Sequence, residues 1–145
     1  MKQMPEIQKF MSSMPHTIGQ DIPIKKALEM MREYQIRHLP VLSGSKLVGI
    51  LTDRDVKLAA SFKDATSLLV EDVMSLEPFT VLPEAPLNRV VSEMAEKKYG
   101  SAVVQQTNGK VVGIFTAVDG LRVLADQLDA FYKASPSDSA VRTHV

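Results

Sequence analysis

The sequence contains no cysteine, and charge of neither sign is in excess. Without cysteine the chain forms no disulfide, no thiolate metal site and no cysteine nucleophile, which fits a reducing compartment. Lysine plus arginine total 17, and aspartate plus glutamate also total 17. Because binding to nucleic acid depends on a positive field, this balance makes nucleic acid an unexpected partner. No apolar run approaches the roughly 18 residues of a membrane span.

The motifs of common enzyme classes are also missing. The chain has no GxSxG, no GxxxxGK[ST] and no GxGxxG motif, so we expect no catalytic activity. Its histidines, His16, His38 and His144, form no i, i+4 pair, and we therefore expect no dedicated metal site. The first residues, MKQMPEIQKFMSSM, lack the apolar region of a signal peptide, so we expect a cytoplasmic protein.

What the sequence does contain is an internal repeat. The chain has 145 residues, of which 45% are hydrophobic, enough for one ordinary domain or two small units sharing a core. An offset of 63 residues aligns Met11 with Met74, and an offset of 64 aligns the later motif GILTDRD (49–55) with GIFTAVD (113–119). Two copies at so long a period indicate a paired domain.

Each copy predicts the same order of elements. An extended segment precedes a helix that begins near a proline, Pro23 or Pro86, and carries an apolar stripe at i, i+3, i+4, i+7 spacing. Two apolar runs follow, separated by turn residues, and a second helix begins after each Thr-x-x-Asp. The prediction is an α/β (α+β) protein of strand, helix, strand, strand, helix units, over 5–62 and 68–133. Residues 134–145 are expected to be a disordered tail.

The repeated motifs have two interpretations from the residues alone. A threonine followed three residues later by an acid is the spacing of a capping box, in which the side chains bond the backbone N–H groups of the first helical turn. The same side chains, at a helix N-terminus, suit the hydroxyls and phosphates of a nucleotide. A duplicated strand-to-helix junction would preserve a cap in either case, and the two roles can coexist.

The chain resembles a tandem pair of cystathionine-beta-synthase (CBS) domains, a Bateman module. The resemblance rests on VMSLEPFTV, the helix after Pro86, IRHLPV and, above all, GILTDRD and GIFTAVD in register, and it covers roughly residues 5 to 133. It implies two βαββα repeats packed about a pseudo-two-fold axis. Such modules bind adenosine nucleotides, of the AMP, ADP or ATP class, in clefts between the repeats and signal occupancy to a partner protein.

The resemblance also implies roles for particular residues. The aspartate of each motif binds ribose hydroxyls and the threonine meets phosphate, through charge-assisted hydrogen bonds; these residues are Thr52, Asp55, Thr116 and Asp119. Cations ahead of the second strand of a repeat reach phosphate; these are Arg37 and His38. The adenine lies against the first and second strands; the residues are Thr17, Ile18 and Pro40 in one pocket and Thr80, Val81 and Val103 in the other.

The two copies differ in the charged residues that are expected to reach phosphate. At the place of Arg37 and His38 the second copy has Gly100 and Ser101, without a cation, so we expect pockets of unequal affinity.

Magnesium is expected only as the companion of a triphosphate. The partners expected are an adenosine nucleotide, a regulated protein and a second copy of the chain in a two-fold homodimer. The alternative is a ligand-free interaction or dimerisation module whose Thr-x-x-Asp motifs are only helix caps.

Overall fold

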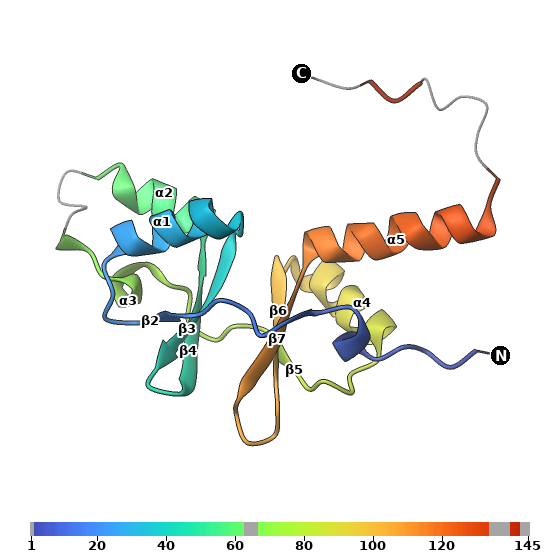
Figure 1. The fold of residues 1–145 in the computed structure, drawn as a ribbon, viewed down its shortest axis with the longest axis horizontal. Coiled ribbons are helices and arrows are strands. Elements are labelled where there is room, and N and C mark those ends of the chain that lie inside the picture. The colour runs from blue at the N-terminus through green and yellow to red at the C-terminus, as the bar shows by residue number, and fades with distance from the viewer. Residues whose placement is uncertain (1, 63–66, 134–139, 143–145) are drawn as a thin grey trace.

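A computed structural model describes residues 2–62, 67–133 and 140–142 (Figure 1). The predicted tail therefore lies outside the described residues except at 140–142. The first repeat contains β2 (Ile18–Gly19), α1 (Ile24–Tyr34), β3 (His38–Ser43), β4 (Lys46–Thr52) and α2 (Asp53–Ala60). The second contains β5 (Thr80–Val81), α4 (Leu87–Lys97), β6 (Ser101–Gln105), β7 (Val111–Thr116) and α5 (Ala117–Phe131). Both repeats thus have the predicted βαββα order, and the mixed α and β class is confirmed.

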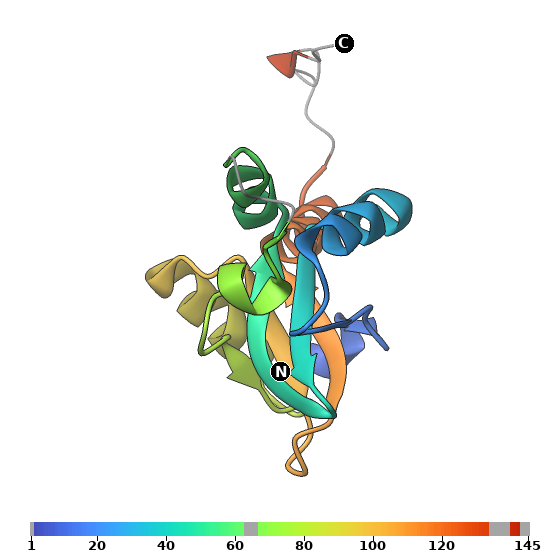
Figure 2. The same cartoon turned by 90° about the vertical axis from the view of Figure 1, so that its left-hand side faces the viewer.

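Three short elements precede these units along the chain. They are η1 (Ile7–Lys9), a single 3-10 turn, β1 (Ser12–Ser13) and α3 (Val70–Val73). The strands form two sheets, one of order β2-β3-β4 and one of order β1-β7-β6-β5. In both, a short parallel strand flanks an antiparallel hairpin, and Figures 1 and 2 show that the two hairpin turns point to the same end of the molecule. Each Thr-x-x-Asp motif follows its hairpin and therefore lies at the opposite end.

The first helix of each repeat is amphipathic and lies against its own sheet. Pro23 and Pro86 occupy the N-cap positions, one residue before the helical turn where they were expected. Each helix ends in a left-handed residue, Gln35 or Lys98, whose N–H bonds the carbonyl of a methionine four residues earlier. Their apolar stripes are buried as predicted; the buried residues are Ile24, Ala27 and Met31 in α1 and Leu87, Val90 and Met94 in α4.

The last helix leaves most of its apolar residues exposed; these are Val118, Leu121, Leu124, Leu128 and Phe131. Val123 is half-buried against the core of the second repeat, and α5 has no fully buried residue. None of the helices in the described part of the chain combines the length and apolar character needed to cross a membrane.

The segment that leads into each repeat packs on the other repeat. Ile7, fully buried, belongs to the core of the second repeat, and Val70, also fully buried, belongs to the core of the first. The Ile7 N–H donates to the Ala85 carbonyl (2.8 Å), and the Val70 N–H donates to the Ile22 carbonyl (2.8 Å). Because both crossings use equivalent positions, neither core is complete without the other half of the chain.

Two motif glycines make room for these crossing segments. A Cβ atom at Gly49 would lie 2.7 Å from the Met74 sulfur and 2.8 Å from the Ser75 carbonyl oxygen, which is closer than real Cβ atoms approach. At Gly113 the added atom would clash with the side chain of Met11, the counterpart of Met74, but with no backbone atom. In each GI[LF]T motif a methionine from the crossing segment therefore lies on the glycine, and at Gly49 a backbone carbonyl also excludes a side chain.

We expect Gly49→Ala to lower the free energy of unfolding by about 1–3 kcal/mol, because the added methyl group overpacks the contact with Met74 and a backbone carbonyl. Gly120→Ala is the control, since its Cβ would meet atoms only at 3.7 to 3.9 Å and alanine suits a helix better than glycine. Urea unfolding of both variants measures the difference. Equal stability of the two would contradict the requirement for close approach at Gly49.

Candidate functional site

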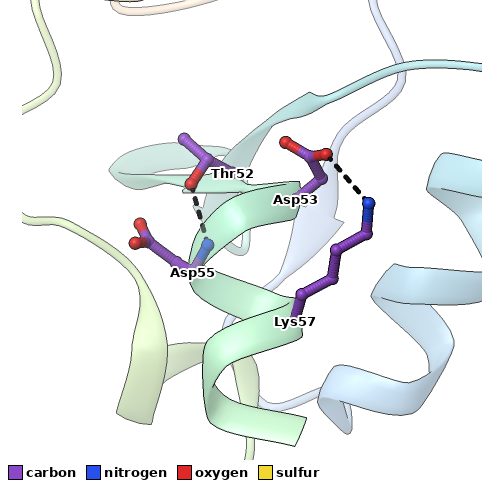
Figure 3. A network of polar contacts seen from close by, with 4 residues as sticks. All are labelled: Thr52, Asp53, Asp55 and Lys57. Atoms are coloured by element: carbon purple, nitrogen blue, oxygen red, sulfur yellow. Dashed lines mark hydrogen bonds and ion pairs between the residues drawn. The ribbon is translucent and has the colours of Figure 1, made fainter. Parts of the chain in front are cut away.

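Both predicted threonines lie where a strand ends and a helix begins. Thr52 is the last residue of β4 and the N-cap of α2, and Thr116 is the last residue of β7 and the N-cap of α5. The hydroxyl of Thr52 accepts a hydrogen bond from the Asp55 N–H at 3.2 Å, as Figure 3 shows, and that of Thr116 accepts from the Asp119 N–H at 3.2 Å. The two motifs therefore act as helix caps.

The aspartates of the two motifs differ in their own contacts. The Thr116 N–H donates to Oδ2 of Asp119 at 2.8 Å, which completes a capping box in the second repeat. Asp55 makes no such bond, and among the described residues no hydrogen bond or ion pair reaches its carboxylate. Half-buried at the first turn of α2, this carboxylate is free to accept from a ligand. In the described part of the chain, the other oxygen of the Asp119 carboxylate, Oδ1, accepts no hydrogen bond.

The first aspartate of GILTDRD, Asp53, faces a different neighbour from Asp55. Asp53 makes an ion pair with Lys57 at 3.4 Å, one turn along α2 (Figure 3). A hollow of about 380 Å³ between α1 and α2 is lined by Arg37, Asp53 and Lys57, together with Leu28, Met31, Gln35 and Ile36. The structure thus places Arg37 beside Asp53 in this hollow, while Arg54 is exposed.

His38 lies where the two repeats meet. It is the first residue of β3, opposite Thr52 on β4, and its Nε2 would lie 3.1 Å from a Cβ added at Gly100 of the second repeat. Burial lowers the pKa of His38 below its ordinary value of 6.5. Asp53 opposes this by raising the pKa, Arg37 lowers it further, and Asp119 of the second repeat raises it. One imidazole is therefore in the field of acids from both repeats.

The residues predicted to contact the base are placed along the short parallel strands. Thr17 and Ile18 line a hollow of about 350 Å³ with Leu42, Ser43 and Gly44, towards the hairpin turn. In the second repeat, Thr80 and Val81 pair with Val103 and Val104.

Three of the predicted base contacts are covered by protein. Pro40 and Val103 are fully buried side chains, and Ile18 is 5% exposed and belongs to the core of the first repeat. A ligand could touch these side chains fully only after the segments that cover them move. Thr17 is half-buried beside the hollow and is more accessible than these three.

Two pairs of stacked aromatic rings were not predicted from the sequence. One pair lies beside the base-contact residues of each repeat. His16 stacks on Tyr34 with centroids 3.7 Å apart, and Phe79 stacks on Tyr99 with centroids 4.8 Å apart. The repeat contained a signal for them, because His16 and Phe79 are aligned at the offset of 63 and directly precede the predicted threonines. Asp53 and Lys57 were missed because the second copy has no charged counterparts.

Comparison with known proteins gives matches along most of the chain. The model of the CBS domain family matches residues 6–61 and 70–126. Inosine-5'-monophosphate dehydrogenase of Korarchaeum cryptofilum is 39% identical over 103 residues, which are 71% of this chain and 21% of that protein. The chain thus spans about a fifth of the length of this curated relative.

Two solved structures extend over almost the whole chain. The protein AcuB of Vibrio cholerae is 27% identical, with a TM-score of 0.78, and the alignment covers 92% of this chain and 100% of that one. The CBS domain pair of the protein MJ0100, solved with 5'-methylthioadenosine and S-adenosyl-L-methionine, is 25% identical, with a TM-score of 0.79; the alignment covers 86% and 99%. These are CBS-pair folds.

Removal of the two motif carboxylates should affect folding unequally. We expect Asp119→Ala to lower the free energy of unfolding by about 0.5–2 kcal/mol, because its carboxylate completes a cap. Asp55→Ala should change it by less than about 0.5 kcal/mol, since no described group bonds that carboxylate. Thermal unfolding of the two ligand-free variants makes the comparison. An equal loss would mean that Asp55 caps α2 in solution as well.

His38 should also make stability depend on pH. Because its folded pKa is lowered, the neutral imidazole contributes stability that is present above pH 6.5 and is lost as the pH falls through the folded pKa. We expect the unfolding temperature to fall more steeply for the native protein than for His38→Gln between about pH 7.5 and about pH 5. Parallel curves for the two proteins would show that His38 does not titrate in this window.

Proposed function

The chain belongs to the CBS domain family, and we propose that it is a regulatory module that binds an adenosine nucleotide between its repeats. The observation that carries the proposal is the paired Thr-x-x-Asp geometry: two strand-to-helix junctions at the same end of the molecule, with His38 of one repeat against Gly100 of the other. The half-buried, unpaired carboxylate of Asp55 adds a group suited to vicinal hydroxyls. Nothing in the described residues uses this carboxylate for folding.

In this proposal the ribose hydroxyls bond Asp55 in one cleft and Asp119 in the other, and Thr52 and Thr116 meet phosphate. The ligand of the MJ0100 domain pair is an adenosine derivative, which supports the adenosine part. The 5' substituent is a separate question, because Arg37 lies beside Asp53 of the first motif and Arg54 belongs to that motif, and both carry positive charge. These groups favour an anionic phosphate of AMP, ADP or ATP over a sulfonium.

Magnesium would arrive with a triphosphate. Within the described residues, no three histidine, aspartate or glutamate side chains are grouped in a way that could hold a metal ion. In our proposal a divalent ion is therefore bound through the phosphates.

A second candidate is supported by the capping bonds themselves. Since Thr52, Thr116 and Asp119 already satisfy backbone groups, the motifs have a structural use without a ligand. The chain would then be an interaction module with empty clefts. The free Asp55 carboxylate favours the nucleotide proposal, because a motif kept only as a cap would use both side chains.

We further propose that the module acts as a two-fold homodimer and reports nucleotide occupancy, and with it the energy state of the cytoplasm, to a regulated protein. A ligand can bias such a signal only by binding one arrangement of the repeats more tightly than another. Segments that cross between repeats couple the two cores, so a change of angle at the cleft is transmitted to both.

Calorimetric titration of the purified protein with AMP, ADP, ATP and S-adenosyl-L-methionine tests the proposal. We expect heat from at least one adenine nucleotide. Asp55→Ala should weaken one class of site by about tenfold or more, because charge-assisted hydrogen bonds to the ribose are lost. Glu29→Ala, an exposed carboxylate on α1, is the matched control and should bind normally. No heat and no thermal shift with any of the ligands would leave the interaction module as the function.

A further inference from the structure

Methionine carries all of the oxidisable sulfur of this chain, which has eight methionines and no cysteine. A thioether takes up one oxygen atom from a peroxide and becomes a sulfoxide, which is polar where the thioether was apolar. Methionine sulfoxide reductases reverse the reaction. The consequence of oxidation therefore depends on what each sulfur contacts in the fold.

Two methionines hold equivalent places in the contact between the repeats. Met11 and Met74 align at the offset of 63. Met11 lies in the segment that leads into the first repeat and packs against the core of the second, whereas Met74 leads into the second repeat and packs against the first core. Figure 1 shows the first of these segments, in blue, passing β7 on its way to β2. Both side chains are half-buried.

Each of these sulfurs lies directly on a strand. The sulfur of Met74 is 2.7 Å from the Cβ position of Gly49, and the sulfur of Met11 lies in the same way on Gly113. The strand thus closes one side of each sulfur to an added oxygen. On the other sides the half-buried side chain meets either the core or solvent. A sulfoxide favours solvent, and this draws the side chain away from the core that it covers.

The backbone N–H groups around Met74 are already bonded. Ser75 donates to the Ile50 carbonyl at 2.9 Å, Ile50 donates to the Ser75 carbonyl at 3.0 Å, and Met74 donates to the Val70 carbonyl at 2.9 Å. A sulfoxide oxygen gains a hydrogen bond from one of these groups only by breaking a bond that holds the crossing segment. Oxidation therefore weakens the attachment of this segment to β4.

We propose that Met11 and Met74 are oxidation sites through which a peroxide loosens the exchange of segments between the repeats. The thioether sulfur attacks one oxygen of hydrogen peroxide, so that an S–O bond forms as the O–O bond breaks. The sulfur loses two electrons, and the departing hydroxide takes the proton of the transferred hydroxyl and leaves as water. The products are one sulfoxide and one water.

The same change reaches the candidate clefts. Met74 lies on β4 and Met11 on β7, and these strands end at Thr52 and Thr116. Loosening of the crossing segments thus releases the strands that position the two motifs. This effect on nucleotide affinity rests on the proposed function, whereas the effect on stability does not.

The other described methionines separate the reaction from its consequence. Met14 is 89% exposed, so it reports that the oxidant is present and has little packing to lose. Met31 and Met94 are buried in the two cores and are shielded from the oxidant. Met30 is half-buried on α1 and packs against the first core, which makes it the matched control for a half-buried thioether outside the crossing segments.

Peroxide treatment of the native protein tests the proposal, with peptide mass mapping of the oxygen taken up at each methionine. We expect Met14 to react first and Met11 and Met74 to follow. The unfolding temperature should fall by about 5 °C or more as the later pair reacts, and methionine sulfoxide reductase should restore it. Full oxidation of Met14 with Met11 and Met74 unchanged would overturn the proposal, and so would oxidation of both without a fall in the unfolding temperature.

Leucine variants assign the loss to particular sulfurs. Met11→Leu combined with Met74→Leu removes both thioethers at nearly constant volume. We expect this double variant to keep its unfolding temperature through the peroxide treatment, while Met30→Leu loses as much as the native protein. If the double variant does not fold, Met74→Leu alone should show about half of the native loss. Leucine variants that lose as much as the native protein would overturn the assignment.

Calorimetric titration before and after oxidation measures the link to the clefts. We expect the affinity for the nucleotide that the native protein binds to fall by about tenfold after oxidation, and to stay unchanged in the treated double variant. An unchanged affinity of the oxidised native protein would overturn this link. A native protein that binds no nucleotide would instead overturn the proposed function, and the unfolding temperatures would still decide the oxidation sites.

Discussion

The exchange of leading segments between the repeats is the contact on which the rest of the structure depends. Ile7 completes the second core and Val70 completes the first, so neither unit of some 60 residues has to stabilise itself alone. Met11 and Met74 lie directly on the motif glycines Gly113 and Gly49. The strands that end in the motif threonines are therefore held from the opposite half of the chain. The exchanged segments therefore fix the positions of both candidate clefts.

Much of this fold could be predicted, because duplication doubles every local signal. The element order followed from the two offsets and from the apolar periods of α1 and α4. The exchange could not be predicted, since β1 has only two residues and carries no period of its own. In the site, the spacing of Thr52 and Asp55 predicted a cap, but the choice of a full or a partial capping box depends on side-chain rotamers. The contact of His38 with Gly100 is tertiary and leaves no local pattern.

Capping and ligand binding compete for the same atoms in this chain. In the second repeat Oδ2 of Asp119 already accepts from the Thr116 N–H, so a ribose would share the carboxylate or displace that bond. In the first repeat, no described group donates a hydrogen bond to the Asp55 carboxylate. A ligand can therefore bind there without displacing a capping bond of that carboxylate. The two motifs share the Thr-x-x-Asp spacing, yet ligand binding to them would have different consequences for folding. The unequal affinity expected from Arg37 and His38 thus has a second source in the caps.

The two motifs also lead into helices of different character, which gives their ligands different effects. Asp55 opens α2, whose outer face carries Arg54 and Lys57, whereas Asp119 opens α5, whose outer face is apolar. A ligand that binds at the N-terminus of α2 mainly moves a solvated surface. The free energy of exposed charges depends little on small changes in the position of the helix. A ligand at Asp119 must reposition the cap of α5, the helix with the exposed apolar face. Any difference in its affinity between two cap geometries is then also a bias between two positions of that helix.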